Sequence, residues 1–513
     1  MMTSRANARG VVATAILGFV SALAGGLTPV SASATPPPQA VDRAVDSDSD
    51  AGVQPATNAL ATDVDSLRDW IHRIHPAPYR FHSAFEFDSA AADLRRRIDG
   101  LPEHHVPIEL HGILALLGDG HSELAALPPS LRGPGLPLFI RRFAEGWFVT
   151  TGHTDLAALF GRPIVSIGGV PMPELVRRLT PYLPADNPMD RLDAIGNWIR
   201  NARVLQFADI AASAGDEVVF EIVEPDGSHR NVPVEVRPAV RLGPDWTDIE
   251  KYLNPEVPEP LFRTLDGNYA CRYLPRERAV YLVFNEVRDG EDLPPIGEFF
   301  PEALAFAERT PAERLVLDIR ENGGGNLDLN APVIRSIIRS RFDHPGRLYV
   351  IIGDDTFSAA MHLAVTLERL AHPIFVGVPT AGRPNSPGDT RELTLPASGV
   401  EIEISELFWQ QSDPRDERPW ITPDIPITPT MRDRLDGRDA ALEAALRHES
   451  TADERAAFRP TMSRWTRSSQ ATAPEWPELL EPAARPIDPE ARPMGPDGGI
   501  GPAEMCEDET SRG

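Results

Sequence analysis

A serine and a glycine-rich segment each follow an apolar run of this sequence. The run 315–319 leads into three consecutive glycines in LVLDIRENGGGN (315–326), and the run 348–352 leads to Ser358. Glycine lets the backbone adopt positive φ and approach a substrate closely, and free N–H groups in such a loop can stabilise an oxyanion. A serine at a strand-to-helix junction lies at the edge of the sheet where α/β sites usually form. The pair predicts a nucleophile facing an oxyanion hole across neighbouring strands.

Each of these features also has an ordinary structural explanation. The glycines suit a tight turn at the end of a strand, and Ser358 or Thr356 suits the N-cap of a helix. Either explanation is sufficient for one motif taken alone. The combination on two successive strands favours the catalytic interpretation.

A serine hydroxyl needs a general base to become a nucleophile. His121 lies in LLGDGHSEL, just after a predicted helix and between a glycine and a serine. A loop histidine is also a common surface residue. His362 comes four residues after Ser358, one helical turn away, and we expect it to point elsewhere or into packing. His121 is therefore the predicted base.

The elements that must position these residues are read from hydrophobic periodicity. From about 260 to 446, apolar strands alternate with helical segments, which predicts a buried, largely parallel α/β sheet. Residues 59–130 have helical spacing and predict a small helical domain. Residues 136–238 contain short strands and turns, and their segment GRPIVSIGGVPMPELVRRL resembles the ligand groove of a PDZ-like domain.

The two ends of the chain are expected to lie outside the folded domains. Arg5 and Arg9, the apolar run 11–27 and the small residues 32–34 form the pattern of a signal peptide over 1–34. Cleavage near Ala34 would place the protein outside the cell, in the periplasm or in the cell envelope, without a membrane span in the mature chain. An uncleaved membrane anchor is the alternative.

The segments next to the folded part differ from it in composition. Residues 35–58 are rich in Pro, Ala, Asp and Ser and predict a disordered linker, and residues 450–513 predict a disordered tail. The formal net charge of −26 argues against nucleic acid or an anionic membrane surface as a partner. Two cysteines, Cys271 and Cys506, do not make a disulfide scaffold or a zinc site, and we expect neither metal nor cofactor.

Four motifs in order resemble one family. LVLDIRENGGGN, DDTFSAAMHLA, VGVPTAGRPNSPGD and TPDIPI are similar to the core of the C-terminal-processing (tail-specific) serine peptidases. That family includes the tricorn core and the repeats of interphotoreceptor retinoid-binding protein. The resemblance implies a crotonase/ClpP-like core sheet over 260–446, preceded by the helical bundle and the PDZ-like domain.

The resemblance also implies roles for individual residues. Ser358 takes the place of the nucleophile, and the oxyanion hole falls on Gly324, with Gly323 beside it, and on the N–H of Ala359. One branch of the family has a lysine base where this chain has Arg383. Arginine stays protonated and cannot be a general base, so Arg383 is instead a candidate for binding the substrate.

The tricorn-like branch uses a histidine, and His121 matches its position. A glutamate near the PD motif orients that histidine, and Glu417 matches it. A serine normally precedes the histidine, but Gly120 stands there in this chain. Ser122 in its place, or Glu417 acting more directly, are the two alternatives.

Together these inferences predict a secreted serine peptidase that hydrolyses peptides or proteins through an acyl-enzyme, with Ser–His–acid logic. The main alternative is a non-catalytic secreted protein on the same fold that binds hydrophobic ligands or peptides. An enoyl-CoA hydratase-like enzyme is disfavoured by the predicted signal peptide. An α/β-hydrolase esterase is disfavoured because no G-x-S-x-G motif surrounds Ser358.

Overall fold

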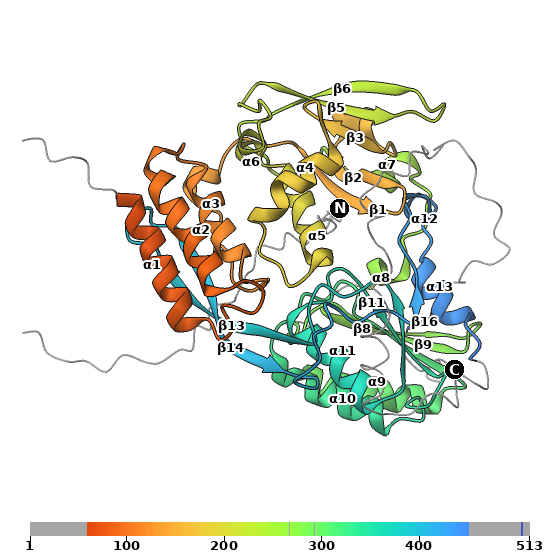
Figure 1. The fold of residues 1–513 in the computed structure, drawn as a ribbon. Coiled ribbons are helices and arrows are strands. Elements are labelled where there is room, and N and C mark those ends of the chain that lie inside the picture. Colours follow the sequence, from red (N-terminus) through yellow and green to blue (C-terminus); the bar gives the residue numbers. More distant parts are fainter. Residues whose placement is uncertain (1–58, 266, 292, 451–503, 506–513) are drawn as a thin grey trace, which may run out of the picture.

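The computed structural model describes residues 59–265, 267–291, 293–450 and 504–505 (Figure 1). The predicted signal peptide and linker lie outside these ranges, as does most of the predicted tail. Within the described residues, no helix combines the length and the apolar character needed to cross a bilayer.

The described part of the chain begins with three helices packed side by side. Their bounds are α1 (Ala59–Ile74), α2 (Ala84–Arg97) and α3 (Val106–Ala115). In α1 the buried side chains of Val64, Leu67 and Ile71 recur every three or four residues, so one stripe of the helix faces the others. Ser83 and Glu86 form a capping box that starts α2.

A long hairpin from the C-terminal half of the chain completes this helical unit. Its strands are β13 (Asn385–Thr394) and β14 (Glu401–Gln410), and Figure 1 shows them reaching from the core to the helices. Ile402 and Ile404 belong to the same buried cluster as the helices. Asp63 of α1 is fully buried and accepts the N–H groups of residues 397 and 398 at the tip of the hairpin.

The middle of the chain forms a twisted antiparallel sheet with short helices. Its hydrogen-bonded order is β1-β2-β3-β5-β6, with β4 beside β3 and β7 beside β2. The strands are β1 (Leu138–Phe143), β2 (Gly146–His153), β3 (Ile164–Ile167), β4 (Val170–Pro171), β5 (Glu217–Val223), β6 (His229–Glu235) and β7 (Trp246–Asp248). The helices are α4 (Met172–Leu179), α5 (Pro188–Ile199), α6 (Ala202–Phe207) and α7 (Ile249–Leu253).

The remaining residues form the core sheet, in the order β15-β12-β11-β10-β9-β8-β16. Its strands are β8 (Tyr269–Leu274), β9 (Ala279–Phe284), β10 (Arg314–Asp318), β11 (Leu348–Ile352), β12 (Pro373–Gly377), β15 (Ile425–Pro426) and β16 (Glu504–Met505). The pairs from β9 to β15 are parallel, and β8 pairs antiparallel with β9 and β16. The predicted buried, largely parallel sheet is confirmed.

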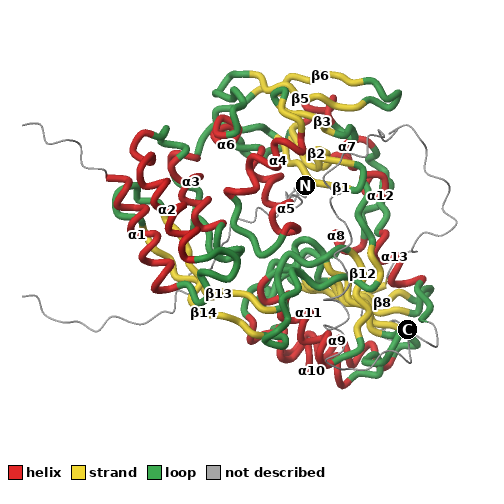
Figure 2. Tube along the Cα trace, in the orientation of Figure 1, coloured by secondary structure: helices red, strands yellow, loops and turns green. Residues whose placement is uncertain are grey.

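Helices cover both faces of the core sheet. They are α8 (Leu261–Thr264), α9 (Ile296–Arg309), α10 (Asn330–Arg339), α11 (Ser358–Leu370) and α13 (Ala440–Arg447), whereas α12 (Met431–Leu435) packs against the middle unit. Residues of α9, α10 and α11 share one buried cluster with alternate strand residues, while α13 packs on the opposite face. Figure 2 shows strands in the middle unit, in the core and in the hairpin β13–β14 beside the first helices.

The mixed α/β class is therefore confirmed. The PDZ-like and crotonase/ClpP-like assignments and the predicted domain boundaries stay predictions. One difference is plain: within the tail predicted to be disordered, Glu504–Met505 forms a strand on the edge of the core sheet. Local composition did not reveal this strand because its pairing is with a distant segment.

Candidate active site

Ser358 is the first residue of α11, directly after the loop that leaves β11. Its φ is +47°, a left-handed conformation that residues other than glycine rarely adopt. Such strain clusters at functional sites because the surrounding structure must maintain it. The N-cap of the helix is Phe357, and no side chain caps it. The explanation of Ser358 or Thr356 as a helix cap is therefore wrong.

The loop before Ser358 is fixed by Thr356. Its buried hydroxyl accepts the N–H of Gly353 at 2.9 Å and donates to the carbonyl of Ile319 at 2.8 Å. The loop after β11 is thereby tied to the loop after β10, which carries the glycines. This tie places the serine and the glycine segment beside each other.

His121 lies against Ser358 although 237 residues separate them. Its Nε2 is 3.0 Å from Ser358 Oγ, which is a hydrogen-bond distance. The imidazole stacks on the ring of Phe357, with centroids 4.4 Å apart. The predicted base and nucleophile are thus brought together in the geometry that proton transfer requires.

Asp119 is the carboxylate on the other side of the imidazole. Its Oδ1 accepts the backbone N–H of His121 at 3.0 Å and lies 3.6 Å from His121 Nδ1, which is longer than a hydrogen bond. Asp119 is fully buried. Its Oδ2 accepts the hydroxyls of Ser122 at 2.6 Å and Ser405 at 2.7 Å and lies 3.2 Å from His75 Nε2.

Sequence reasoning missed Asp119 as a site residue. An available signal was its place two residues before the histidine in GDGH, from where a side chain can reach back to the same ring. Ser405 and His75 come from β14 and from the end of α1 and carried no such signal. Their contacts with Asp119 depend on the packing of the hairpin against the helices, which local sequence patterns did not predict.

Glu417 is placed differently from the role implied by the resemblance. Its side chain is exposed, and it lies close enough to Arg80 to oppose the lowering of the Arg80 pKa by burial. The carboxylate at the imidazole is that of Asp119. Ser122 donates to Asp119 and so supports this carboxylate.

The space around position 120 explains why a glycine stands there. A Cβ there would lie 2.5 Å from Asp190 Oδ2 and 3.0 Å from the ring of Phe357. A serine side chain does not fit beside these groups without a shift. The N–H of Gly120 donates to Asp186 Oδ1 at 2.9 Å, which holds the histidine loop against the middle unit.

The charges around His121 are unusual. Burial lowers the pKa of His121, but the Asp119 carboxylate, with Asp186 and Asp190 behind it, raises that pKa to about 9. Burial also raises the pKa of Asp119, but its interactions with the imidazoles of His121 and His75 outweigh this and hold the pKa below its usual range. At neutral pH the imidazole is therefore mostly protonated in the resting structure.

Two further carboxyl groups complete this environment. Burial raises the pKa of Asp186 and, together with the nearby charge of Asp186, raises that of Asp190 well above its usual range. Asp119, His121 and Asp186 offer ligand atoms within 4.8 Å of one another, a spacing that would also suit a cation. Asp186 already accepts the N–H groups of Gly120 and Arg383.

Gly324 lies directly beside the nucleophile. Its φ is +114°, and a Cβ there would be 2.6 Å from Ser358 Cβ and 2.9 Å from the nitrogen of Ala359. Only glycine fits this close approach. The N–H of Gly324 donates to Asn322 Oδ1 at 2.9 Å, so another acceptor occupies it in this conformation.

The other two predicted oxyanion donors differ from Gly324. Ala359 is the second residue of α11, so its N–H belongs to the first turn, which has no acceptor within the helix. Gly323 is exposed, and a Cβ added there would meet no atom within 4 Å. The glycine loop and the helix start thus flank Ser358.

Arg383 lies on the core loop that faces the middle unit. Its N–H donates to Asp186 Oδ2 at 3.0 Å, and its Nε donates to the Asp186 carbonyl at 2.6 Å. The guanidinium is 4.5 Å from the ring centroid of Phe81. Burial lowers the Arg383 pKa, and the charges of Arg80 and Arg191 act in the same direction, so three arginines gather here.

His362 has the packing role expected from its place in α11. It is buried, and its ring centroid lies 5.8 Å from that of Trp409 on β14. Burial lowers its pKa to about 4, with a further contribution from the charge of His121. A packed histidine with so low a pKa is only weakly basic and is a poor candidate for the general base.

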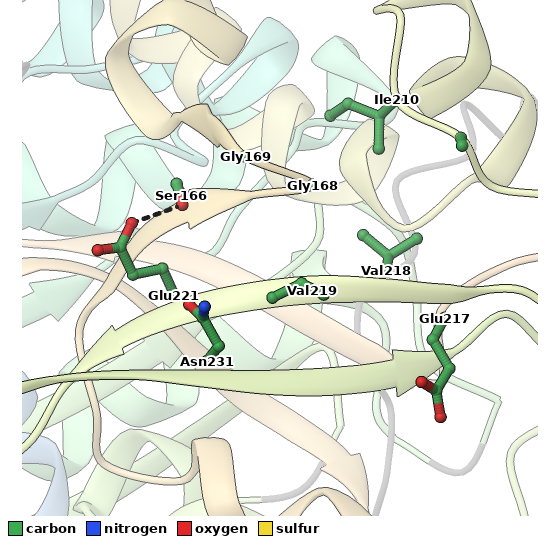
Figure 3. Close-up of a pocket in the computed structure, with 10 residues that line it drawn as sticks. Ser166, Gly168, Gly169, Ile210, Glu217, Val218, Val219, Glu221 and Asn231 are labelled. Carbon is green, nitrogen blue, oxygen red and sulfur yellow. Dashed lines mark hydrogen bonds between the residues drawn. The ribbon is translucent and has the colours of Figure 1, made fainter.

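A separate pocket of about 520 Å³ opens on the middle unit (Figure 3). Its lining includes the turn Gly168–Gly169, Ile210 and the outer face of β5. Ser166 donates to Glu221 at 2.8 Å at one end of the pocket, and Glu217 lies at the other end. The turn is the one in the segment that resembles a PDZ-like groove.

Comparison by sequence alone finds no relative of this chain. No protein-family model matches it, and no curated protein is similar to it. Solved structures do match. A structure of mature CPAF complexed with lactacystin aligns with a TM-score of 0.55 at 14% identity, covering 74% of this chain and 95% of that chain.

Two more structures extend the comparison. A second crystal structure of mature CPAF aligns with a TM-score of 0.54 at 14% identity, over 77% of this chain and 98% of that one. The photosystem II D1 C-terminal processing protease aligns at 15% identity with a TM-score of 0.37, over 75% and 99% of the two chains. At this level of identity the likeness concerns the fold, and the chain shares the fold of mature CPAF.

Proposed function

We propose that this chain is a serine peptidase with Ser358 as nucleophile and His121 as general base. The observation that carries the proposal is the 3.0 Å separation of His121 Nε2 and Ser358 Oγ. Two further features support it: the left-handed backbone of Ser358 at a helix start and the fold shared with CPAF. The substrate class is a peptide or protein.

The proposed reaction uses Ser358 and His121 in the roles of nucleophile and general base. Neutral His121 takes the hydroxyl proton as Ser358 Oγ attacks the scissile carbonyl, and the oxygen of the tetrahedral intermediate becomes negative. The imidazolium then gives the proton to the leaving amine, and an acyl-enzyme remains on Ser358. Water, deprotonated in the same way, attacks the ester and releases the acid.

The oxyanion is held by the N–H of Ala359 and by the glycine loop. We assign the glycine-loop donor in this conformation to Gly323, because the N–H of Gly324 is given to Asn322. The role of Gly324 is then to admit the nucleophile, since any side chain there would overlap Ser358. A peptide flip that releases Gly324 would add a further donor.

Asp119 takes the orienting role that the resemblance gave to Glu417. Its carboxylate holds the backbone of His121 and faces Nδ1, and it is itself fixed by two serine hydroxyls. Asp119 Oδ1 and His121 Nδ1 are 3.6 Å apart. Hydrogen bonds between catalytic groups are often long before a substrate binds and shorten when it does, and we expect the same of this pair. The charge of Asp119 stabilises the imidazolium that forms during the reaction.

Substrate recognition is assigned to two regions. Arg383, with Arg80 beside it, offers positive charge for a substrate carboxylate close to the site. The middle unit acts as a PDZ-like module that binds an extended peptide by strand addition, and the core acts as a crotonase/ClpP-like sheet. Secretion through the segment 1–34 remains part of the proposal.

The test is labelling with a fluorophosphonate probe, which reacts only with an activated serine. Wild type should be labelled increasingly as the pH rises from 7 to 10, because neutral His121 becomes more abundant. Ser358→Ala and His121→Ala should both lose labelling. His229→Ala removes an exposed histidine of β6 and is the matched control that should keep it.

Circular dichroism of each variant shows whether the fold is intact. If folded wild type remains unlabelled across that pH range, the peptidase proposal is wrong. A screen for hydrophobic and peptide ligands would then address the binding-protein alternative.

A further inference from the structure

A second histidine contacts the carboxylate that faces His121. His75 follows α1 directly, and its N–H donates to the carbonyl of Ile71 at 3.1 Å. Pro76 comes next, and a proline disfavours the helical conformation in the residue before it, so α1 ends here. The side chain of His75 is completely buried, and its Nε2 lies 3.2 Å from Asp119 Oδ2.

The backbone beside His75 determines which ring nitrogen carries the hydrogen. The N–H of Ala77 points at His75 Nδ1 at a distance of 3.2 Å, and a backbone N–H can only donate. Nδ1 is therefore the acceptor, and the hydrogen of the neutral imidazole is on Nε2. Because Nε2 faces Asp119, His75 is a hydrogen-bond donor to that carboxylate.

The two oxygens of Asp119 have different partners. Oδ2 accepts the hydroxyls of Ser122 at 2.6 Å and Ser405 at 2.7 Å, and it also faces His75 Nε2. Oδ1 accepts the backbone N–H of His121 and faces the Nδ1 of the same residue. Three donors at Oδ2 prevent the carboxylate from turning, so Oδ1 stays directed at the imidazole of the general base.

The three donors at Oδ2 are not equivalent. The hydroxyl hydrogens of Ser122 and Ser405 can rotate to follow their acceptor. The ring of His75 is instead fixed by its burial and by its bond with the N–H of Ala77. A donor that cannot follow the carboxylate defines the direction in which the carboxylate must lie.

We propose that His75 is a positioning residue of the candidate active site, which donates its Nε2 hydrogen to Asp119 and thereby holds that carboxylate against His121. This role rests on the proposed peptidase function. His75 does not touch the reacting atoms and acts only through Asp119. Because His75 belongs to the end of α1, the N-terminal helical unit is part of the machinery that prepares the general base.

Two substitutions at position 75 separate the donor from the packing. His75→Gln retains an N–H donor at about the reach of Nε2, whereas His75→Met fills the space with a flexible side chain that has no donor. We expect fluorophosphonate labelling of the full-length protein to be at least about 10-fold slower in His75→Met, because hydrogen bonds to buried charged groups are strong. His75→Gln should label within about threefold of wild type.

His72 provides a matched control on the same helix. Its Nε2 lies 3.3 Å from Asp88 Oδ1, and both side chains of this pair are partly exposed. His72→Met removes a comparable histidine–carboxylate pair and should label like wild type. Equal loss of labelling in His72→Met and His75→Met, equal loss in His75→Gln and His75→Met, or normal labelling of His75→Met would each overturn the proposal.

Nuclear magnetic resonance tests the hydrogen bond without catalysis, even if His75→Met fails to fold. In wild type with nitrogen-15 histidine, the ring signals of His75 are assigned by their absence in His75→Gln. They should show a hydrogen on Nε2 and none on Nδ1, and a hydrogen on Nδ1 would overturn the proposal. Wild type that shows the expected tautomer but remains unlabelled would instead refute the peptidase function on which the role of His75 depends.

Discussion

Replacing Asp119 by asparagine is the most informative perturbation of the candidate site. The change keeps the size of the side chain and removes its charge, so His121 loses the main group that raises its pKa to about 9. Burial continues to lower that pKa, so the acid limb of the pH profile should move below pH 7. Activity in wild type should instead rise with pH through about 9, because only neutral His121 accepts the serine proton.

The size of the effect should depend on pH. At high pH, where His121 is neutral in both proteins, kcat/KM should fall about 10³–10⁴-fold, as when a triad carboxylate is neutralised. That is a loss of about 4–5 kcal/mol of transition-state stabilisation. At pH 7 only about 1% of wild-type His121 is neutral, because the pKa is two units higher. In the Asp119→Asn variant His121 is mostly neutral at pH 7. The loss of kcat/KM relative to wild type should therefore be about 100-fold smaller at pH 7 than at high pH.

The assay is the pH dependence of fluorophosphonate labelling rate, or of peptide hydrolysis once a substrate is known. Glu417→Gln is the matched control, because the family resemblance gives it the same role while the structure leaves it exposed. It should change the rate by less than about threefold, since exposed charges act weakly. A shifted profile in Glu417→Gln with a normal one in Asp119→Asn would refute the reasoning.

Four other substitutions test the remaining features of the site. Gly324→Ala should reduce labelling more than about 100-fold, because its Cβ would overlap Ser358, whereas Gly323→Ala should fold and label nearly normally. Gly120→Ser, which restores the residue expected from the family, should lower rather than raise both activity and the melting temperature, measured by calorimetry, because the space beside it is filled. Arg383→Gln should raise KM for peptides with a free carboxyl terminus about 10-fold and leave their amidated counterparts unchanged, as measured by steady-state kinetics.

Much of the core could be predicted from local sequence patterns. The apolar runs at 279–284, 315–319 and 348–352 form buried parallel strands, because burial on both faces requires an unbroken apolar run. The position of Ser358 after such a strand was also predicted from the sequence pattern. The predicted base, His121, lies where the proton transfer needs it.

The partners of the histidine could not be predicted in this way. Glu417 matched a pattern in the sequence, but its chain segment leaves the side chain in solvent. The hairpin β13–β14 carries Ser405 to Asp119 across 286 positions, and hydrophobic packing of its far end on α1–α3 sets that distance. The strand β16 was not predicted, because it is only two residues long and lies in a proline-rich part of the sequence.

Local sequence patterns predict the available chemistry: a serine at a strand end, glycines that permit close approach, and a histidine in a loop beside a glycine. Long-range packing is needed to show which carboxylate faces that histidine and which donors flank the nucleophile. The reason is that periodicity reports contacts between near neighbours in the sequence, whereas Ser358 reaches His121 across 237 positions and Ser405 reaches Asp119 across 286. Asp119 shares a motif with His121, but Asp186 and Asp190, which also raise the pKa of His121, come from the middle unit.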